Sequence, residues 1–268
     1  MSELLVSNEG AVRLLTLNRP DKLNAYNVAL HSALLKAIDE ADNDPGVRVI
    51  VVTGAGRVFC AGADFEEGFD TFAATDAVDM IDGVKRDLGG VLNLRTHESD
   101  TPIIAAINGS AVGVGATMTI PMDIRIASNR AKFSFPFARR GIVFDGAASY
   151  FLPRLVGFAK AQEWILKADL FSAEEALAGG FMSELTEPEN VLPRAMELAQ
   201  DIALNCSPTS VANNKKLLRE SMAGNGPVAA HAMESKMLAK AFVSPDCAEG
   251  VQAFLEKRAP NFEDRAPK

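Results

Sequence analysis

The stretch of the sequence that most constrains the fold runs from Thr101 to Met122 and contains no charged residue. Such a run is long enough to cross a bilayer as a single helix. Glycine, proline and asparagine interrupt it at several points, and a lone helix in lipid would leave the backbone groups freed there without partners. We therefore expect a buried strand over residues 103–107, a glycine-rich turn and a short apolar helix from Gly113 onward, in a protein that does not bind membranes.

Strand and helix patterns alternate along the first half of the chain. Residues 11–17, the β-branched residues 47–52 and residues 123–127 have the composition of strands. Asn27 is placed to cap a helix whose apolar side chains recur at helical spacing. The polar segment further along predicts a helix near residues 77–94, and helical spacing dominates the last third. A chain of 268 residues with this order is typical of one α/β fold.

The charge balance and the residue composition argue against several function classes. With 27 basic against 35 acidic residues the net charge is −8, and 7% of residues are aromatic. Neither the basic surface nor the stacking residues of a nucleic-acid-binding protein are therefore expected. The three histidines lie far apart in the sequence, which argues against a zinc site. An odd number of cysteines and an N-terminus unlike a signal peptide indicate a reduced, cytoplasmic protein.

Several motifs of nucleotide-binding and nucleophilic enzymes are missing. Gly113 and Gly115 lack the third glycine of a dinucleotide-binding turn, and no acidic residue follows at the distance that binds a ribose. The serine after Gly109 stands one place too early for a nucleophile elbow. No phosphate-binding loop ending in Gly-Lys-Ser or Gly-Lys-Thr occurs. Nicotinamide-dependent enzymes, serine hydrolases and nucleotide hydrolases are therefore disfavoured.

Two turns of small residues directly follow predicted buried strands. One spans residues 53–65 and the other residues 108–115, where a helix begins. Small residues let a ligand approach the backbone closely, and N–H groups at a helix start attract negative charge. Two such turns on neighbouring strands would aim two N–H groups at one carbonyl oxygen and form an oxyanion hole from the backbone alone. The alternative is that the glycines serve only the geometry of tight turns.

Four segments of the sequence are distinctive when taken together. They are Leu-Asn-Arg-Pro at 17–20 with Asn24-Ala25, Phe-Cys-Ala-Gly-Ala-Asp at 59–64, the stretch 105–115, and Glu-Gly with Ala-Phe-Leu-Glu-Lys-Arg between 249 and 258. In this order, over nearly the whole chain, they resemble the crotonase family, also called the enoyl-CoA hydratase/isomerase superfamily. The resemblance implies an α/β fold built as a spiral of ββα units over residues 1–195. It also implies a helical C-terminal region, residues 196–268, that covers CoA and assembles a homotrimer or homohexamer.

The crotonase family acts on acyl-CoA thioesters and stabilises an enolate with two backbone N–H groups. Carried onto this sequence, these groups belong to Ala63 and Val114. The second position is usually glycine, so the valine adds a side chain to the pocket wall. Because CoA is part of the substrate, no separate cofactor is implied. The resemblance also implies contacts to CoA for Ala25, Ala61, Asp64, Phe65, Phe254 and Lys257. Lys257 equally suits a solvated cation at the end of a helix.

Two glutamates that position and split water in hydratases of this family have no counterpart in the sequence. The matching positions hold Thr117 and Phe137. Addition of water to a double bond needs groups that activate the water and move its proton. Neither threonine nor phenylalanine acts as a base near neutral pH. The resemblance therefore favours a reaction other than conventional hydration.

A different acid, Asp145, stands at the start of a predicted helix, where ordinary hydratases of the family have glycine. Some relatives that isomerise enoyl-CoA double bonds place a carboxylate there, as do some dehalogenating relatives. One carboxylate beside an oxyanion hole is sufficient to carry a proton between C2 and C4. An apolar neighbour such as Phe137 or Phe144 would raise its pKa by desolvation and make it a better base. The alternative is that Asp145 only caps its helix.

Three hypotheses for the function follow. The first is an enoyl-CoA isomerase in which Asp145 is the acid and base and the N–H groups of Ala63 and Val114 hold the enolate oxygen. The second is an enoyl-CoA hydratase or an acyl-CoA hydrolase in which Asp145 directs a water molecule. The third is a CoA-binding protein without catalysis. All three expect an acyl-CoA partner, no nucleic acid and no bound metal.

Overall fold

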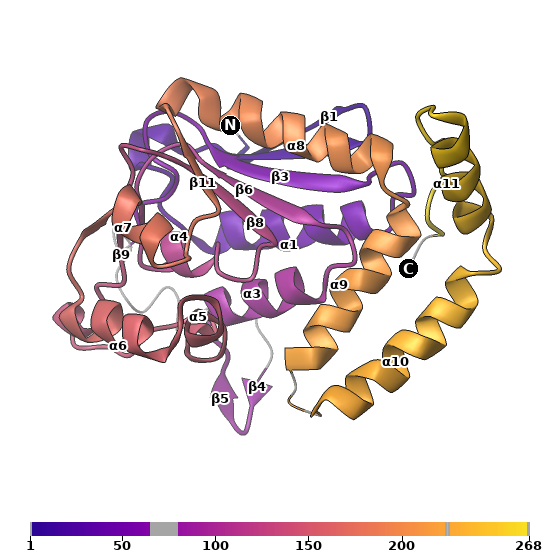
Figure 1. The fold of residues 1–268 in the computed structure, drawn as a ribbon. Helices are drawn as coiled ribbons and strands as arrows, with labels where there is room; N and C mark the ends of the chain where they lie inside the picture. Colours follow the sequence, from indigo (N-terminus) through magenta and orange to yellow (C-terminus); the bar gives the residue numbers. More distant parts are fainter. Residues whose placement is uncertain (1, 65–79, 223, 225, 267–268) are drawn as a thin grey trace.

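A six-stranded sheet lies at the centre of the computed structural model, which describes residues 2–64, 80–222, 224 and 226–266 (Figure 1). The strand order is β1, β2, β3, β6, β8, β11. β1 and β2 are antiparallel and the other neighbouring strands are parallel. The strands are β1 (Leu4–Glu9), β2 (Val12–Leu17), β3 (Val49–Gly54), β6 (Ile103–Ile107), β8 (Ile124–Ser128) and β11 (Glu184–Thr186).

The two faces of this sheet are covered by different helices. Helix α8 (Val191–Asn205) packs over one face, and α1 (Val28–Asp42) lies against the other (Figure 1). Every residue of β3 and β6 is buried, because both strands are central and covered on both sides. Their parallel register pairs Thr53 with Ala106, so both strands end at the same edge of the sheet. The two glycine-rich turns leave the sheet at this edge.

A smaller sheet and a cluster of aromatic rings support the second turn. Its strands run in the order β10 (Phe171–Ser172), β9 (Lys132–Ser134) and β7 (Ala111–Val112). Beneath it the rings of Trp164 and Phe171 stack with their centroids 4.2 Å apart. The remaining helices of this half are α3 (Leu88–Glu98), α4 (Val114–Thr117), α5 (Ala148–Val156), α6 (Phe158–Lys167) and α7 (Ala173–Ala178). Short 3-10 turns cover Pro20–Lys22, Ala138–Arg140 and Pro188–Asn190.

The predicted α/β class is confirmed, and one predicted helix is wrong over residues 80–87. Asn27 caps α1 as expected, since its side-chain oxygen accepts the Leu30 N–H at 2.9 Å. The helix expected near residues 77–94 is in part a hairpin of β4 (Met80–Ile81) and β5 (Val84–Lys85), and α3 begins only at Leu88. The Asp-Gly pair that joins β4 to β5 favours a two-residue turn with positive φ angles, which a continuous helix cannot contain.

Three helices beyond the sheet form the C-terminal part of the chain: α9 (Pro208–Met222), α10 (Gly226–Ala241) and α11 (Pro245–Glu256). α10 and α11 stand apart from the sheet (Figure 1). Both helices expose several large apolar side chains. The predicted division between residues 195 and 196 falls inside α8, and the assembly role of the C-terminal region stays a prediction. In the described part of the chain, no helix combines the length and the hydropathy needed to span a membrane.

Candidate active site

A pocket of about 240 Å³ opens where the two glycine-rich turns meet α3 and the segment before α5. It contains five of the residues that the sequence singled out, namely Ala61, Ala63, Val114, Phe137 and Asp145. The described residues around them are Tyr26, Gly62, Asp87, Leu88, Gly89, Val112, Gly113, Arg140 and Ile142. Residues far apart in the sequence therefore form one concave, mostly apolar surface with two carboxylates.

The two turns are in direct contact at their glycines. A Cβ on Gly113 would lie 3.9 Å from the Cα of Gly62, and a Cβ on Gly62 would lie 3.2 Å from the carbonyl oxygen of Val112. Gly62 has φ +112°, which favours glycine at this position. The Val112 N–H donates to the Cys60 carbonyl at 3.0 Å and ties the turns together. The expectation that both turns meet at one site is thus met by the geometry.

Two residues that line this pocket, Ala63 and Val114, have backbone N–H groups without a backbone partner in the described ranges. Tyr26 donates its N–H to Gly62 and accepts from Asp64, so the pairing passes over the N–H of Ala63 between them. Val114 is the first residue of α4, where an N–H has no acceptor inside its own helix. No backbone hydrogen bond within the described ranges uses either N–H as its donor. Such a pair can bind an oxygen that carries negative charge.

Asp145 lies at the side of the pocket with its carboxylate bound to one hydroxyl. Thr117 Oγ1 donates to Asp145 Oδ1 at 2.8 Å. Burial raises the pKa of Asp145 to about 6, the nearby charge of Asp87 acts in the same direction, and the Thr117 hydrogen bond opposes them. Helix α5 begins after Ala147, and none of the described side chains caps it. The structure therefore does not support the alternative in which Asp145 serves only as a helix cap.

Asp87 and Asn93, both associated with α3, reach the pocket region and were missed by the sequence reasoning. Asp87 caps α3 by accepting the Gly90 N–H, and it also accepts the Gly146 N–H at 3.1 Å. Asn93 is fully buried and donates to the carbonyl oxygens of Thr117 and Gly146. An aspartate two places before a pair of glycines was the available signal for the cap, but nothing in the sequence links it to Asp145.

The residues predicted to contact CoA fall into three groups. Asp64 lies in the first turn and Ala25 is linked to it by Arg19, which donates to the Ala25 carbonyl and to the Asp64 carboxylate, the latter at 2.7 Å. Ala61 lines the pocket itself. Phe65 lies outside the described residues. Phe254 and Lys257 are exposed residues at the end of α11, which Figure 1 places well away from α4.

Three further polar side chains in or beside the pocket are fully buried, namely those of Cys60, Tyr26 and His31. Desolvation raises the pKa of the Cys60 thiol to about 12, so Cys60 is a packed side chain rather than a nucleophile, as expected. Tyr26 donates from its hydroxyl to Nδ1 of His31 at 2.7 Å if the imidazole is neutral. Burial lowers the pKa of His31 to about 4, so it is neutral at physiological pH. Across the described residues, no cluster of three or more His, Cys, Asp or Glu side chains could hold a metal ion.

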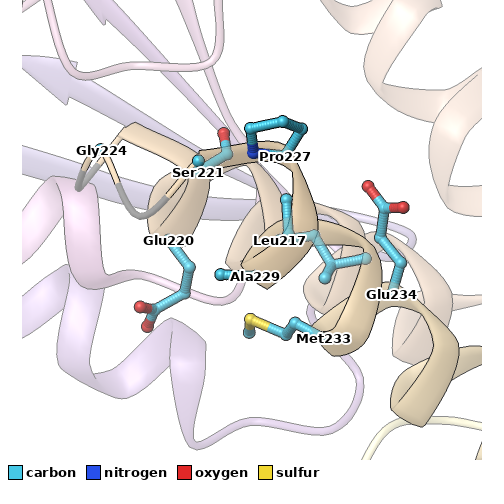
Figure 2. A pocket seen from close by; sticks show the side chains of 10 residues that line it. Leu217, Glu220, Ser221, Gly224, Pro227, Ala229, Met233 and Glu234 are labelled. Carbon is cyan, nitrogen blue, oxygen red and sulfur yellow. The ribbon is translucent and has the colours of Figure 1, made fainter.

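A second pocket, of about 400 Å³, lies between α9 and α10 (Figure 2). Leu217, Ala229 and Met233 form part of its wall, and the carboxylates of Glu220 and Glu234 lie at its edges. Its described lining carries no cation and none of the residues that the sequence singled out. The pocket between the two glycine-rich turns is therefore the candidate active site.

Comparisons with known proteins cover almost the full chain. A family model described as "Enoyl-CoA hydratase/isomerase" matches residues 7–265. "Enoyl-CoA hydratase ACTT3" of Alternaria alternata is 43% identical over 94% of this chain and 83% of its own length. "1,2-epoxyphenylacetyl-CoA isomerase" of Escherichia coli is 34% identical over 98% of this chain and 99% of its own. A probable enoyl-CoA hydratase/isomerase from Mycobacterium abscessus, 35% identical, matches the fold with a TM-score of 0.90 over 99% of this chain and 100% of its own, which confirms the predicted fold class.

Proposed function

Because the chain belongs to the enoyl-CoA hydratase/isomerase family, we propose that it shifts a carbon–carbon double bond in an enoyl-CoA thioester. The thioester oxygen binds to the N–H groups of Ala63 and Val114. Asp145 takes a proton from C2 of a 3-enoyl-CoA, and the electron pair moves onto the thioester oxygen to give a dienolate. Return of the same proton to C4 gives the 2-enoyl-CoA and restores the Asp145 carboxylate.

The position and the proton affinity of Asp145 carry this proposal. A base works best when its pKa lies close to the working pH, and burial raises the pKa of Asp145 to about 6. Its carboxylate accepts a hydrogen bond from the side chain of Thr117, which occupies one of the two slots where hydratases of the family carry a glutamate. Phe137, in the other slot, adds an apolar wall to the pocket. One proton carrier beside two N–H donors is what a double-bond shift needs.

CoA recognition and assembly follow as parts of the same proposal. Ala25, Ala61 and Asp64 lie around the first turn, where they can bind the pantetheine arm and nucleotide of CoA, and no cofactor is needed besides the substrate. Phe254 lies on α11 and Lys257 directly follows it, and Figure 1 places α11 well away from α4, whose first residue lines the pocket. A homotrimer or homohexamer formed through the C-terminal helices would let these two residues reach CoA in a neighbouring subunit.

Hydration is the second candidate, and one observation favours it. The pocket contains a second carboxylate, Asp87, in addition to Asp145, so two acids are present even though neither occupies a slot of the lost glutamates. The relative from Alternaria alternata is also named a hydratase. In this reaction Asp145 would take a proton from the water that attacks C3 of a 2-enoyl-CoA, and the same proton would then be returned to C2 of the enolate.

The test is a comparison of purified wild-type protein with Asp145→Ala and Asp145→Asn on 3-enoyl-CoA and 2-enoyl-CoA thioesters of several chain lengths. We expect wild-type protein to convert 3-enoyl-CoA to 2-enoyl-CoA and both variants to lose at least about 100-fold in kcat, as for removal of a general base. Asp82→Asn, on the exposed β4–β5 turn, is the matched control for loss of a carboxylate. Isomerisation by Asp145→Ala at the wild-type rate would refute the proposal, and rapid hydration without isomerisation would favour the second candidate.

A further inference from the structure

Both polar backbone groups of Gly146, the residue after Asp145, are bound by α3 and its cap. The Asp87 carboxylate accepts the Gly146 N–H at 3.1 Å. The Asn93 side-chain amide donates to the Gly146 carbonyl at 2.7 Å. The same amide donates to the Thr117 carbonyl at 2.9 Å, and the Thr117 hydroxyl binds Asp145. α3 therefore contacts Asp145 indirectly from two sides, through Gly146 and through Thr117.

The packing around Gly146 leaves this arrangement little freedom. A Cβ at Gly146 would lie 2.7 Å from Asn93 Nδ2 and 3.0 Å from Thr117 Oγ1, so no other residue fits without moving these groups. Asn93 has 0% of its surface exposed, and water therefore cannot replace the bonds that its amide makes. Buried hydrogen bonds of this kind fix a loop in one conformation, because breaking them leaves polar groups without partners.

We propose that Asp87 and Asn93 are positioning residues that fix the Asp145 carboxylate in the pocket by holding the N–H and the carbonyl of Gly146. The inference rests on the proposed role of Asp145 in proton transfer. A general base must lie within hydrogen-bond reach of the proton that it removes. A misplacement of about 1 Å can lower the rate about 100-fold, so a support of this kind acts mainly on kcat.

Asp87 also acts on Asp145 through its negative charge. A Cβ at Gly89 would lie 3.4 Å from Asp87 Oδ1 and 3.5 Å from Asp145 Cγ, which shows that both carboxylates border the same small space. After burial, the charge of Asp87 is the second cause that raises the pKa of Asp145. Of the other titratable groups lining the pocket, Tyr26 stays neutral because burial raises its pKa, and Arg140 lies exposed at the mouth.

If Asp87 transferred a proton itself, substitutions at position 87 would affect the rate differently than they would for a positioning residue. A proton-transfer group needs its ionisable carboxylate, whereas a positioning residue needs only an oxygen that accepts hydrogen bonds. Asp87 Oδ1 accepts the N–H of both Gly90 and Gly146. Asparagine at this position can keep both bonds with its amide oxygen, and serine can cap α3 but is too short to reach Gly146.

The first experiment therefore compares Asp87→Asn and Asp87→Ser in the full-length protein, with Asp82→Asn as the control for charge. kcat and KM for 3-enoyl-CoA are measured across pH 4.5–9. We expect Asp87→Ser to lose roughly 10- to 100-fold in kcat with little change in KM. Asp87→Asn should retain most of the wild-type kcat, and the acidic limb of its pH profile should move to lower pH. An Asp87→Asn enzyme as impaired as Asp87→Ser, or an Asp87→Ser enzyme at the wild-type kcat, would overturn the inference.

A second readout does not depend on turnover. The carboxyl carbons of aspartate are labelled with carbon-13, and the Asp145 signal is assigned by its loss in Asp145→Asn and titrated by NMR. We expect its midpoint to fall in Asp87→Asn and its chemical shift to change in Asp87→Ser. An Asp145 signal that is the same in both variants as in wild-type protein would count against the inference. If these shifts appear in a protein that does not isomerise any enoyl-CoA, the proposed function fails while the positioning role stands.

Discussion

Gly115 faces the carbonyl oxygen of Cys60 so closely that a Cβ at Gly115 would lie 2.3 Å from that oxygen. The same Cβ would lie 2.8 Å from Cys60 Cβ. The Cys60 carbonyl is also the acceptor for Val112, the bond that ties the two glycine-rich turns together. The distance between the N–H groups of Ala63 and Val114 therefore depends on a glycine at position 115.

We expect Gly115→Ala to separate the two turns and to lower kcat/KM for 3-enoyl-CoA by about 100-fold, because the new methyl group must displace a hydrogen-bonded carbonyl. The free energy of unfolding should fall by ~1–3 kcal/mol, as for other overpacked sites. The control is Gly46→Ala in an exposed turn, where the only close neighbour is the end of the Asp44 side chain. Wild-type kinetics in Gly115→Ala would show that the turns tolerate separation.

The elements that depend on local pattern could be predicted from the sequence. The central strands followed from β-branched runs, with β3 displaced by two residues from the predicted 47–52, and the helix after Asn27 followed from its cap and its apolar spacing. A meeting of the two turns was one of two alternatives that the sequence left open, the other being that the glycines serve only the geometry of tight turns. Asp145 was named from the resemblance to a family, and its partner Thr117 was named as the slot of a lost glutamate.

The support for Asp145 could not be predicted, because it consists of contacts between residues distant in sequence. Asn93 bonds to residues 24 and 53 positions further along the chain, and no periodicity or motif predicts such pairs. Asp87 follows a hairpin that the sequence reasoning assigned to a helix, so its role as a cap was hidden. The resemblance to a family thus named the candidate base and the candidate oxyanion donors, and only tertiary packing revealed the contacts around them.

The charge of Asp145 should lower the stability of the folded protein at neutral pH. The pKa of Asp145 in the folded protein is about 6, against an ordinary aspartate value of 3.8. The protonated carboxyl group therefore stabilises the fold fully below pH 3.8, and this stabilisation is lost as pH rises through 6. Asp145→Asn keeps an acceptor for Thr117 and has no charge. We expect the free energy of unfolding of Asp145→Asn to exceed that of wild type by more at pH 8 than at acidic pH, the change being up to ~3 kcal/mol. Urea unfolding at pH 4.5 and pH 8, at equal protomer concentration, measures this difference, and a gain that does not change with pH would contradict it.

The hydroxyl of Thr117 should tune the pH dependence of the reaction. Its hydrogen bond to Asp145 favours the ionised carboxylate and lowers the pKa of Asp145. Thr117→Val keeps the shape of the side chain and removes the donor, so the acidic limb of the kcat profile should move to higher pH. Thr117→Ser keeps the hydroxyl and is the matched control. A Thr117→Val profile that overlays that of wild type would show that this bond does not act on the reacting carboxylate.

The buried pair of Tyr26 and His31 should make the fold sensitive to acid. His31 is 1% exposed, and burial lowers its pKa to about 4 in the folded protein, against 6.5 for an ordinary histidine. The unfolded chain therefore binds a proton between these pH values while the folded chain does not, so stability is lost as pH falls from 6.5 to 4, by up to ~3 kcal/mol. His31→Gln keeps an acceptor for the Tyr26 hydroxyl and cannot titrate in this range, so it should lose less stability on acidification than wild type.

Asp145 changes stability in the opposite direction over this range, but it is present in both proteins and cancels from the difference between them. His231→Gln, at an exposed histidine, should unfold like wild type at every pH, and a His31→Gln protein with the same acid sensitivity as wild type would exclude His31 as the cause.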